Sequence, residues 1–420
     1  MPKRSDPRDR STAHRPLVQG VGRKRGLSNV GGRIEAAGDP AAASVIERAF
    51  AVRAGERDAT LTHPFHAYPA RLHPEVARQL VADVVRENPR ATIFDPCCGS
   101  GTVLVETLVA GAKAVGTDLS PLAIELANLK TTITTSAERV GMVEAAHDIG
   151  KQVAAIARSS EPLRHPRGEE RWFHPYTLRE VSALVVAIES VPQGFVRSAL
   201  RMLLSSVLVK ISLQSSDSDP RRVADKPVRP GAAPHLFARK SLELDGCLAA
   251  LARATPRGTP RADAHSDDAT TLRTIANESI DAIITSPPYA NTYDYLEHHT
   301  RRYRWLRMDP GALGEREIGA SRWFEEPEAG TMRFERETRA MIEAFARVLR
   351  PGGRAYVVMA DGAAGDKPLF ADDLLHESIR DTSLRVLATV SQTRPVFDEI
   401  SAAAFRRRPK REHLVALVRE

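Results

Sequence analysis

The sequence has few cysteines, and their spacing does not suit a metal site. Cys97, Cys98 and Cys247 are the only cysteines among 420 residues. Adjacent cysteines rarely pair with each other, and no CxxC pair or Cys/His cluster has zinc spacing. We therefore expect reduced thiols in a cytoplasmic protein that holds no metal.

Long apolar runs are also missing. No stretch approaches the roughly 18 residues of a membrane-spanning helix, and the polar, Arg-rich start lacks the apolar region of a secretory signal. Aromatic residues make up only 5% of the chain, but 42% of its residues are hydrophobic. That content is enough for one large domain with an insertion, or for two domains.

The positive charge is concentrated at the start of the chain. Residues 1–34 contain nine Lys or Arg and two Asp, which accounts for the whole net charge of +7. Residues 1–55 also have few large apolar side chains, so we predict a disordered basic tail. This tail is either a solvated segment or a weak nucleic-acid tether. The basic isoelectric point is therefore no sign of a nucleic-acid-binding body.

The rest of the chain alternates between strand and helix patterns. Residues 92–130 read as strand, Gly-rich turn, helix, strand, turn and helix, which is typical of a parallel α/β sheet. Helical periodicity and a polar loop interrupt this pattern at 141–262. The prediction is a first core part at 56–140, a mostly helical insertion at 141–262 and a second core part at 263–420.

A glycine-rich loop follows the first core strand. In "IFDPCCGSGTVLVE", Asp95 ends the strand and Gly99, Ser100, Gly101 and Thr102 begin a helix. Glycines let the backbone approach a ligand, and the start of a helix offers free N–H groups. Neither dinucleotide spacing nor a P-loop lysine is present, which disfavours nucleotide triphosphate hydrolysis.

Asp118 ends the second core strand, in "AVGTDLS". A carboxylate at this point can accept hydrogen bonds from both ribose hydroxyls of an adenosine. Together with the Gly-rich loop it predicts an adenosine-containing cofactor. The alternative is purely structural: a tight turn that needs glycine, followed by a helix cap.

A later strand ends in a rigid loop. The apolar run "DAIIT" gives way to Ser286, Pro287, Pro288 and Tyr289. Two prolines cannot donate to a strand ladder, so they end the strand and fix the loop that follows. The simple interpretation is a strand end with rim packing.

Together, "DPCCGSGT" and "TSPPY" resemble the motifs of DNA amino-methyltransferases. That family uses S-adenosylmethionine to methylate the exocyclic amine of cytosine (N4) or adenine (N6). The resemblance covers most of residues 60–420 outside the insertion. It implies a class I methyltransferase fold, α/β with a mostly parallel seven-stranded sheet. "HPFHAYPAR" and "DDATTL" are similar to two further family segments. The implied cofactor-binding residues are Phe65, Tyr68, Pro69, Asp95, Gly99, Ser100, Gly101, Thr102, Asp118 and Asp268.

The resemblance also implies catalytic roles for the Ser-Pro-Pro-Tyr loop. Ser286 and the Pro287 carbonyl would accept the amine hydrogens, Pro288 would stiffen the loop, and Tyr289 would stack on a base flipped out of the duplex. Serine in the first position favours cytosine N4. Adenine N6 comes next, then an RNA amino-methyltransferase, and last an inactive DNA-binding regulator. Cys97 follows a proline, as the nucleophile of cytosine-C5 enzymes does, but it lies in the cofactor loop, which disfavours that role.

Double-stranded DNA is the expected partner, and a cognate restriction endonuclease is a further one that the resemblance allows. The insertion is the expected target-recognition region, and residues 300–335 are the alternative. Basic clusters suit phosphate contact, although a solvated basic loop is the simpler interpretation. The predicted DNA-binding residues are Arg221, Arg222, Arg406, Arg407, Arg408, Lys410 and Arg411.

Overall fold

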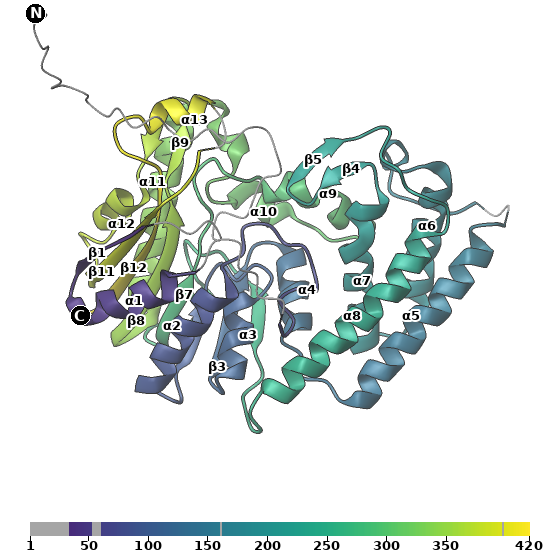
Figure 1. Ribbon diagram of the computed structural model, residues 1–420, viewed down its shortest axis with the longest axis horizontal. Coiled ribbons are helices and arrows are strands. Elements are labelled where there is room, and N and C mark those ends of the chain that lie inside the picture. Colours follow the sequence, from purple (N-terminus) through teal and green to yellow (C-terminus); the bar gives the residue numbers. More distant parts are fainter. Residues whose placement is uncertain (1–32, 53–59, 160–161, 397–398) are drawn as a thin grey trace, which may run out of the picture.

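The computed structural model describes residues 33–52, 60–159, 162–396 and 399–420. Helices cover both faces of a central sheet, and a helical bundle stands beside it (Figure 1). The sheet has eight strands in the order β1-β11-β12-β8-β7-β2-β3-β6. Its strands are β1 (Ile34–Gly38), β2 (Thr92–Asp95), β3 (Lys113–Asp118), β6 (Asp263–Ser266), β7 (Ile280–Thr285), β8 (Leu349–Ala360), β11 (Leu384–Thr393) and β12 (Arg411–Arg419).

The helices divide between the sheet and the bundle. Those of the core and its loops are α1 (Pro40–Phe50), α2 (Pro74–Glu87), α3 (Thr102–Val109), α4 (Pro121–Lys130), α9 (Tyr295–Trp305), α10 (Gly311–Arg316), α11 (Pro327–Val348), α12 (Ala371–Ser378) and α13 (Glu399–Ala404). Those of the insertion are α5 (Ser136–Ile156), α6 (Pro175–Ser190), α7 (Phe195–Ile211) and α8 (Ala232–Ala254).

The sheet is parallel in its centre and antiparallel at one side. Strands β8, β7, β2, β3 and β6 pair in parallel. Strand β12 runs antiparallel to both β8 and β11. This arrangement confirms the predicted fold class, the class I methyltransferase fold. The β11–β12 connection therefore lies at the edge where the parallel strands end.

One strand more is present than predicted, and it corrects the boundary of the tail. Strand β1 pairs with β11 as an eighth, antiparallel edge strand. Helix α1 follows it and buries Ile46 and Phe50 in the core. Disorder was therefore the wrong prediction for residues 34–50. The Arg-rich stretch at 1–32 lies outside the described residues.

Two apolar cores sandwich the sheet. Helices α1, α2 and α3 bury side chains such as Leu80 and Leu104 against one face. Helices α11 and α12 bury Phe345 and Leu375 against the other. Alternate side chains of a strand point to opposite faces, and neighbouring β7 residues do so here: Ala282 and Ile284 belong to the first core, and Ile283 belongs to the second.

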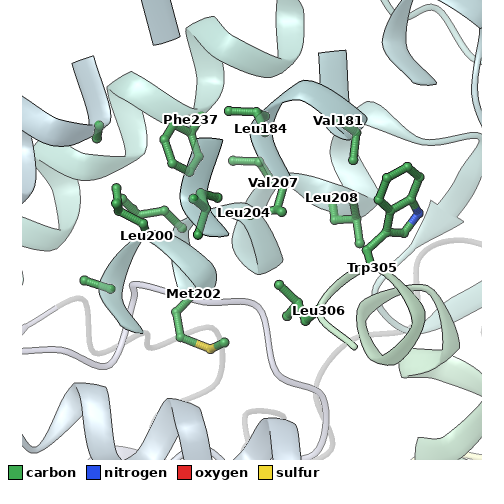
Figure 2. Packing of buried hydrophobic residues seen from close by; sticks show 14 of the residues in the cluster. Val181, Leu184, Leu200, Met202, Leu204, Val207, Leu208, Phe237, Trp305 and Leu306 are labelled. Carbon is green, nitrogen blue, oxygen red and sulfur yellow. The ribbon is translucent and has the colours of Figure 1, made fainter. Parts of the chain in front are cut away.

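The insertion is a helical bundle with a core of its own. Figure 2 shows α6 and α7 side chains such as Leu184 and Leu204 packed against Phe237 of α8. Trp305, at the end of α9, joins the same cluster. The bundle reaches the sheet through α4, whose Leu122 and Leu126 belong to this cluster. None of the described helices is long and apolar enough to cross a membrane.

A small hairpin inside the insertion occupies part of the predicted polar loop. Strands β4 (Gln214–Ser216) and β5 (Asp219–Arg222) pair antiparallel. The hairpin holds helix α9 through two buried arginines: Arg302 pairs with Asp217, and Arg301 donates to Gln214 at 2.6 Å. The insertion is thus fastened to the helix that follows the Ser-Pro-Pro-Tyr loop.

Ile46→Ala tests whether α1 belongs to the folded core. Ile46 is fully buried, so its truncation leaves a cavity and should cost about 2–5 kcal/mol of stability. Exposed Glu47 is the matched control, and Glu47→Ala should change stability by less than about 0.5 kcal/mol. Urea denaturation of the full chain measures both, and equal midpoints would show that α1 is dispensable.

Candidate active site

A cavity opens at the carboxyl ends of β2, β3 and β7, where parallel α/β sheets bind ligands. Its empty volume, including the open mouth, is about 830 Å³. The wall comes from the segment before α2, the Gly-rich loop, the end of β3, the loop after β7 and the region around α10. Among the predicted site residues, those that line it are Tyr68, Asp95, Gly99, Ser100, Thr102, Asp118, Ser286 and Pro288.

Two predicted cofactor residues lie in the surrounding packing instead. Phe65 is fully buried in the core that the bundle shares with α4. Gly101 has a φ of 83°, and an added Cβ would lie 3.1 Å from the Ala127 backbone. The lack of a side chain at position 101 thus allows α3 to pack closely on α4. Pro69 is half-buried beside Tyr68 and is not part of the cavity wall.

Asp268 is also not part of the cavity wall. Its carboxylate accepts hydrogen bonds from the Thr270 backbone N–H and hydroxyl, and it lies 3.5 Å from Arg316. Its neighbours Asp267 and Ala269 form this part of the wall. The prediction is one residue away from the acid that lines the cavity, Asp267. The sequence does not separate the two, because "DDATTL" contains two adjacent acids with the same local pattern.

Buried carboxyl groups, namely Asp118, Asp95 and Glu317, give the cavity its electrostatic character. Asp118 accepts hydrogen bonds from the backbone N–H groups of Gly99 at 2.9 Å and Ser120 at 2.8 Å. Burial nevertheless raises its pKa to about 6. Burial also raises the pKa of Asp95 to about 7, although Thr285 and the Cys97 N–H donate to it. Each ionised carboxylate keeps lone pairs for ligand donors and favours a cationic ligand.

One hydroxyl in the wall lacks a partner. Thr102 Oγ1 is buried at the start of α3 and makes no hydrogen bond within the described part of the chain. An unsatisfied buried polar atom is costly, so this position suits a polar ligand. The hydroxyl, the two carboxylates and the Gly-rich loop fit the adenosine and amino acid groups of S-adenosylmethionine.

Cys97 lines the same cavity but is poorly suited to nucleophilic attack. Burial and the charges of Asp118 and Asp95 raise the pKa of its thiol well above the ordinary value. Since the thiolate is the reactive form, this shift disfavours nucleophilic attack by Cys97 near neutral pH.

A second, smaller pocket of about 270 Å³ adjoins the first. Pro287 and Tyr289 line the smaller pocket, and Ser286 lines the larger one. Tyr293 completes the smaller wall. The residues that line both are Ala70, Pro288 and Tyr295.

Aromatic rings give this second pocket its shape. Tyr295 lies 6.0 Å from Tyr68 in a stacked arrangement and 5.8 Å from Tyr293. The sequence left open whether Tyr293 and Tyr295 form a pocket wall or start a helix. Tyr295 does both, because it is the first residue of α9, which Asp294 caps.

Sequence reasoning missed one residue altogether. Tyr289 Oη donates to Glu412 at 2.8 Å, and it lies 3.2 Å from Ser286 Oγ. Glu412 is fully buried in β12 and forms an ion pair with Arg394. The only local signal was an acidic residue at the head of the apolar run "HLVALV".

Several of the predicted DNA-binding residues already have partners in the structure. Arg408 pairs with Asp372 and Asp373, and Arg411 pairs with Glu35. Arg221 pairs with Asp219 on the hairpin. Lys410 is half-buried, 5.7 Å from the Phe405 ring. The residues with exposed side chains are Arg221, Arg222, Arg406 and Arg407, and Arg222 donates to the Arg171 carbonyl at 2.6 Å. Contact with DNA stays a prediction.

The chain resembles known proteins over limited stretches. A family model described as an RMKL-like methyltransferase domain, UPF0020, matches residues 64–168. The Type II methyltransferase M.MvaI of Kocuria varians is 40% identical over 73 residues, which are 17% of this chain and 16% of that protein. The Type II methyltransferase M.AvaI of Nostoc is 24% identical over 242 residues, 54% of this chain and 49% of that protein.

All three are methyltransferases. The chain spans half or less of the length of these two relatives. The family match contains the Gly-rich loop and Asp118, so it supports S-adenosylmethionine as the cofactor of the larger cavity. A solved SAM-dependent methyltransferase from Methanosarcina mazei aligns with 81% of this chain and 96% of its own, at 10% identity and a TM-score of 0.32.

Thr102→Val tests the fit of the cofactor. The hydroxyl has no partner within the described residues, so its loss should leave the melting temperature unchanged. A hydrogen bond to the ligand should be lost, which weakens S-adenosylmethionine binding about five- to tenfold. Calorimetric titration measures the affinity. Unchanged affinity would place the ligand elsewhere in the cavity.

The raised pKa values predict how binding depends on pH. Ionised carboxylates accept hydrogen bonds and attract a cation, so affinity should level off above about pH 8 and fall as Asp95 and Glu317, and then Asp118, become protonated. The fall approaches about tenfold per pH unit for each proton taken up. Titrations from pH 5 to 8 measure it. Asp118→Asn should bind weakly at pH 8 and show a shallower profile.

Proposed function

We propose that the chain transfers a methyl group from S-adenosylmethionine to the exocyclic amine of a flipped base in DNA, with cytosine N4 the favoured target. One observation carries this proposal: the Ser-Pro-Pro-Tyr loop stands between two adjoining pockets. The larger suits the cofactor, and the smaller has an aromatic wall. A donor and a planar acceptor would therefore meet at Ser286.

The cofactor, when bound, supplies a methyl group that its sulfonium already activates. The protein's own task is then to bind and orient both molecules. Asp118 and Thr102 would hold polar groups of the cofactor, and the nearby carboxylates suit its positive charge. Buried Pro287 keeps the acceptor loop in one conformation.

The target amine is a weak nucleophile, because its lone pair is delocalised into the ring. Ser286 Oγ and the Pro287 carbonyl would accept hydrogen bonds from its two N–H groups. These bonds would favour the pyramidal form of the amine nitrogen. No strong base is needed before the attack, since the amine becomes acidic once it carries the methyl group. Its proton can then pass to solvent.

A base in a duplex cannot present this amine, because the amine is paired. Flipping brings the base out of the stack, and aromatic faces replace the lost stacking. Tyr289 and Tyr293 line a pocket beside Ser286. This arrangement supports a flat, ring-shaped acceptor.

The similarity to Type II methyltransferases supports DNA as the polymer. Serine at position 286 supports cytosine over adenine through the resemblance of the motif. A restriction endonuclease partner and a cytoplasmic location stay predictions of that resemblance.

Nucleoside mass spectrometry tests the choice of base. The full chain is incubated with unmethylated plasmid DNA and S-adenosylmethionine, and the DNA is digested to nucleosides. N4-methylcytosine is the expected product. N6-methyladenine would overturn the cytosine assignment, and methyl transfer to RNA alone would overturn DNA. Lack of cofactor binding would favour an inactive DNA-binding protein.

Ser286→Ala should lower turnover at least about a hundredfold, the scale of losing one group that stabilises a transition state. Cofactor affinity should change less than about twofold, because the proposal assigns Ser286 to the target amine and not to a polar group of the cofactor. Single-turnover methylation and calorimetry separate the two effects. Equal losses in both would show that Ser286 serves the cofactor instead of the amine.

A further inference from the structure

A chain of buried polar contacts leads from β12 to the catalytic loop. Arg394 donates to Glu412 Oε2, with its Nε at 3.1 Å. The other carboxylate oxygen, Oε1, accepts from Tyr289 Oη at 2.8 Å. Tyr289 Oη in turn lies 3.2 Å from Ser286 Oγ. Arg394 and Glu412 are 4% and 0% exposed, so water does not compete for this ion pair.

The contacts allow only one direction of donation. Glu412 forms a buried ion pair with the Arg394 guanidinium, and a carboxylate in such a pair only accepts hydrogen bonds. Tyr289 must therefore donate its single hydroxyl proton to Glu412. Toward Ser286 the tyrosine oxygen can then only accept, so Ser286 donates its proton to Tyr289.

This direction decides what Ser286 offers to the cavity. With its proton turned toward Tyr289, the serine oxygen presents only lone pairs to the open side, where it lines the wall. A free serine hydroxyl could point its proton at an incoming amine and repel the amine hydrogens. In this arrangement the Ser286 oxygen can only accept a hydrogen bond from the amine. The charged Glu412–Arg394 pair at the other end strengthens each hydrogen bond of the chain.

We propose that Glu412 and the Tyr289 hydroxyl are positioning groups, which fix Ser286 as a hydrogen-bond acceptor for the target amine. This inference rests on the proposed function and adds a second task for Tyr289, whose ring faces the base pocket. Glu412 lies 123 residues from Tyr289 in the sequence and acts only through it.

A double-mutant cycle tests the coupling. Tyr289→Phe keeps the ring and the Glu412–Arg394 pair but removes the hydroxyl. Turnover on unmethylated plasmid DNA should fall about tenfold with KM unchanged, the scale of one oriented hydrogen bond. In the Ser286→Ala background the same change should have almost no further effect, because the group it positions is gone. Additive losses would overturn the proposal.

Tyr293→Phe is the matched control, because Tyr293 lines the same pocket. Its effect on turnover should be the same with and without Ser286→Ala. Glu412→Gln should couple to Ser286→Ala as Tyr289→Phe does, measured below the melting temperature of each variant. If Ser286→Ala leaves turnover unchanged, the proposed function fails. If it lowers turnover but the cycles are additive, only the positioning chain fails.

Neutron diffraction of the full chain in D₂O provides a test without turnover. The deuteron of Tyr289 should lie between Oη and Glu412 Oε1, and that of Ser286 should lie between Oγ and Tyr289 Oη. A Tyr289 deuteron that points to Ser286, or a deuteron on Glu412, would overturn the proposal.

Discussion

The pairing of β2 with β7 is the constraint on which the site depends. Ile93 and Phe94 of β2 pair with Ala282 and Ile283 of β7, although these strands lie far apart in the sequence. Because the pairing is parallel, the Gly-rich loop and the Ser-Pro-Pro-Tyr loop leave the sheet at the same edge. Thr285 Oγ1 joins the two ends by donating to Asp95 at 2.8 Å. A shift in this register would separate the cofactor cavity from the aromatic pocket.

The same edge concentrates carboxyl groups that the fold must stabilise. Asp95, Asp118 and Glu317 all line the cavity, and burial raises the pKa of each. Backbone N–H groups, Thr285 and Arg322 offset part of the desolvation. A bound cation would offset more of it. The fold thus keeps a site whose charge is best balanced when the cofactor is present.

Local sequence patterns were enough for the parts of the fold that are contiguous. A few adjacent residues are enough to predict three features. They are the Gly-rich turn between strand and helix, Asp118 at a strand end, and the double proline. Helix α1 was missed because "PAAASVIERAF" consists mainly of alanine and polar residues, and its burial comes from the sheet it packs on. Glu412 was missed because its partners, Tyr289 and Arg394, are distant in the sequence. Similarly, the packing of Gly101 on Ala127 depends on how α3 meets α4.

The ion pairs of the β11–β12 connection bear on how it could meet a polyanion. Arg408 and Arg411 already lie against Asp372, Asp373 and Glu35. These carboxylates already neutralise the two arginines in place of salt ions. A phosphate that bound the arginines would therefore displace protein carboxylates and would release few salt ions. Contacts of this kind add little to the salt dependence of association. Exposed Arg406 and Arg407 would therefore dominate long-range attraction, and their paired neighbours would act only at contact distance.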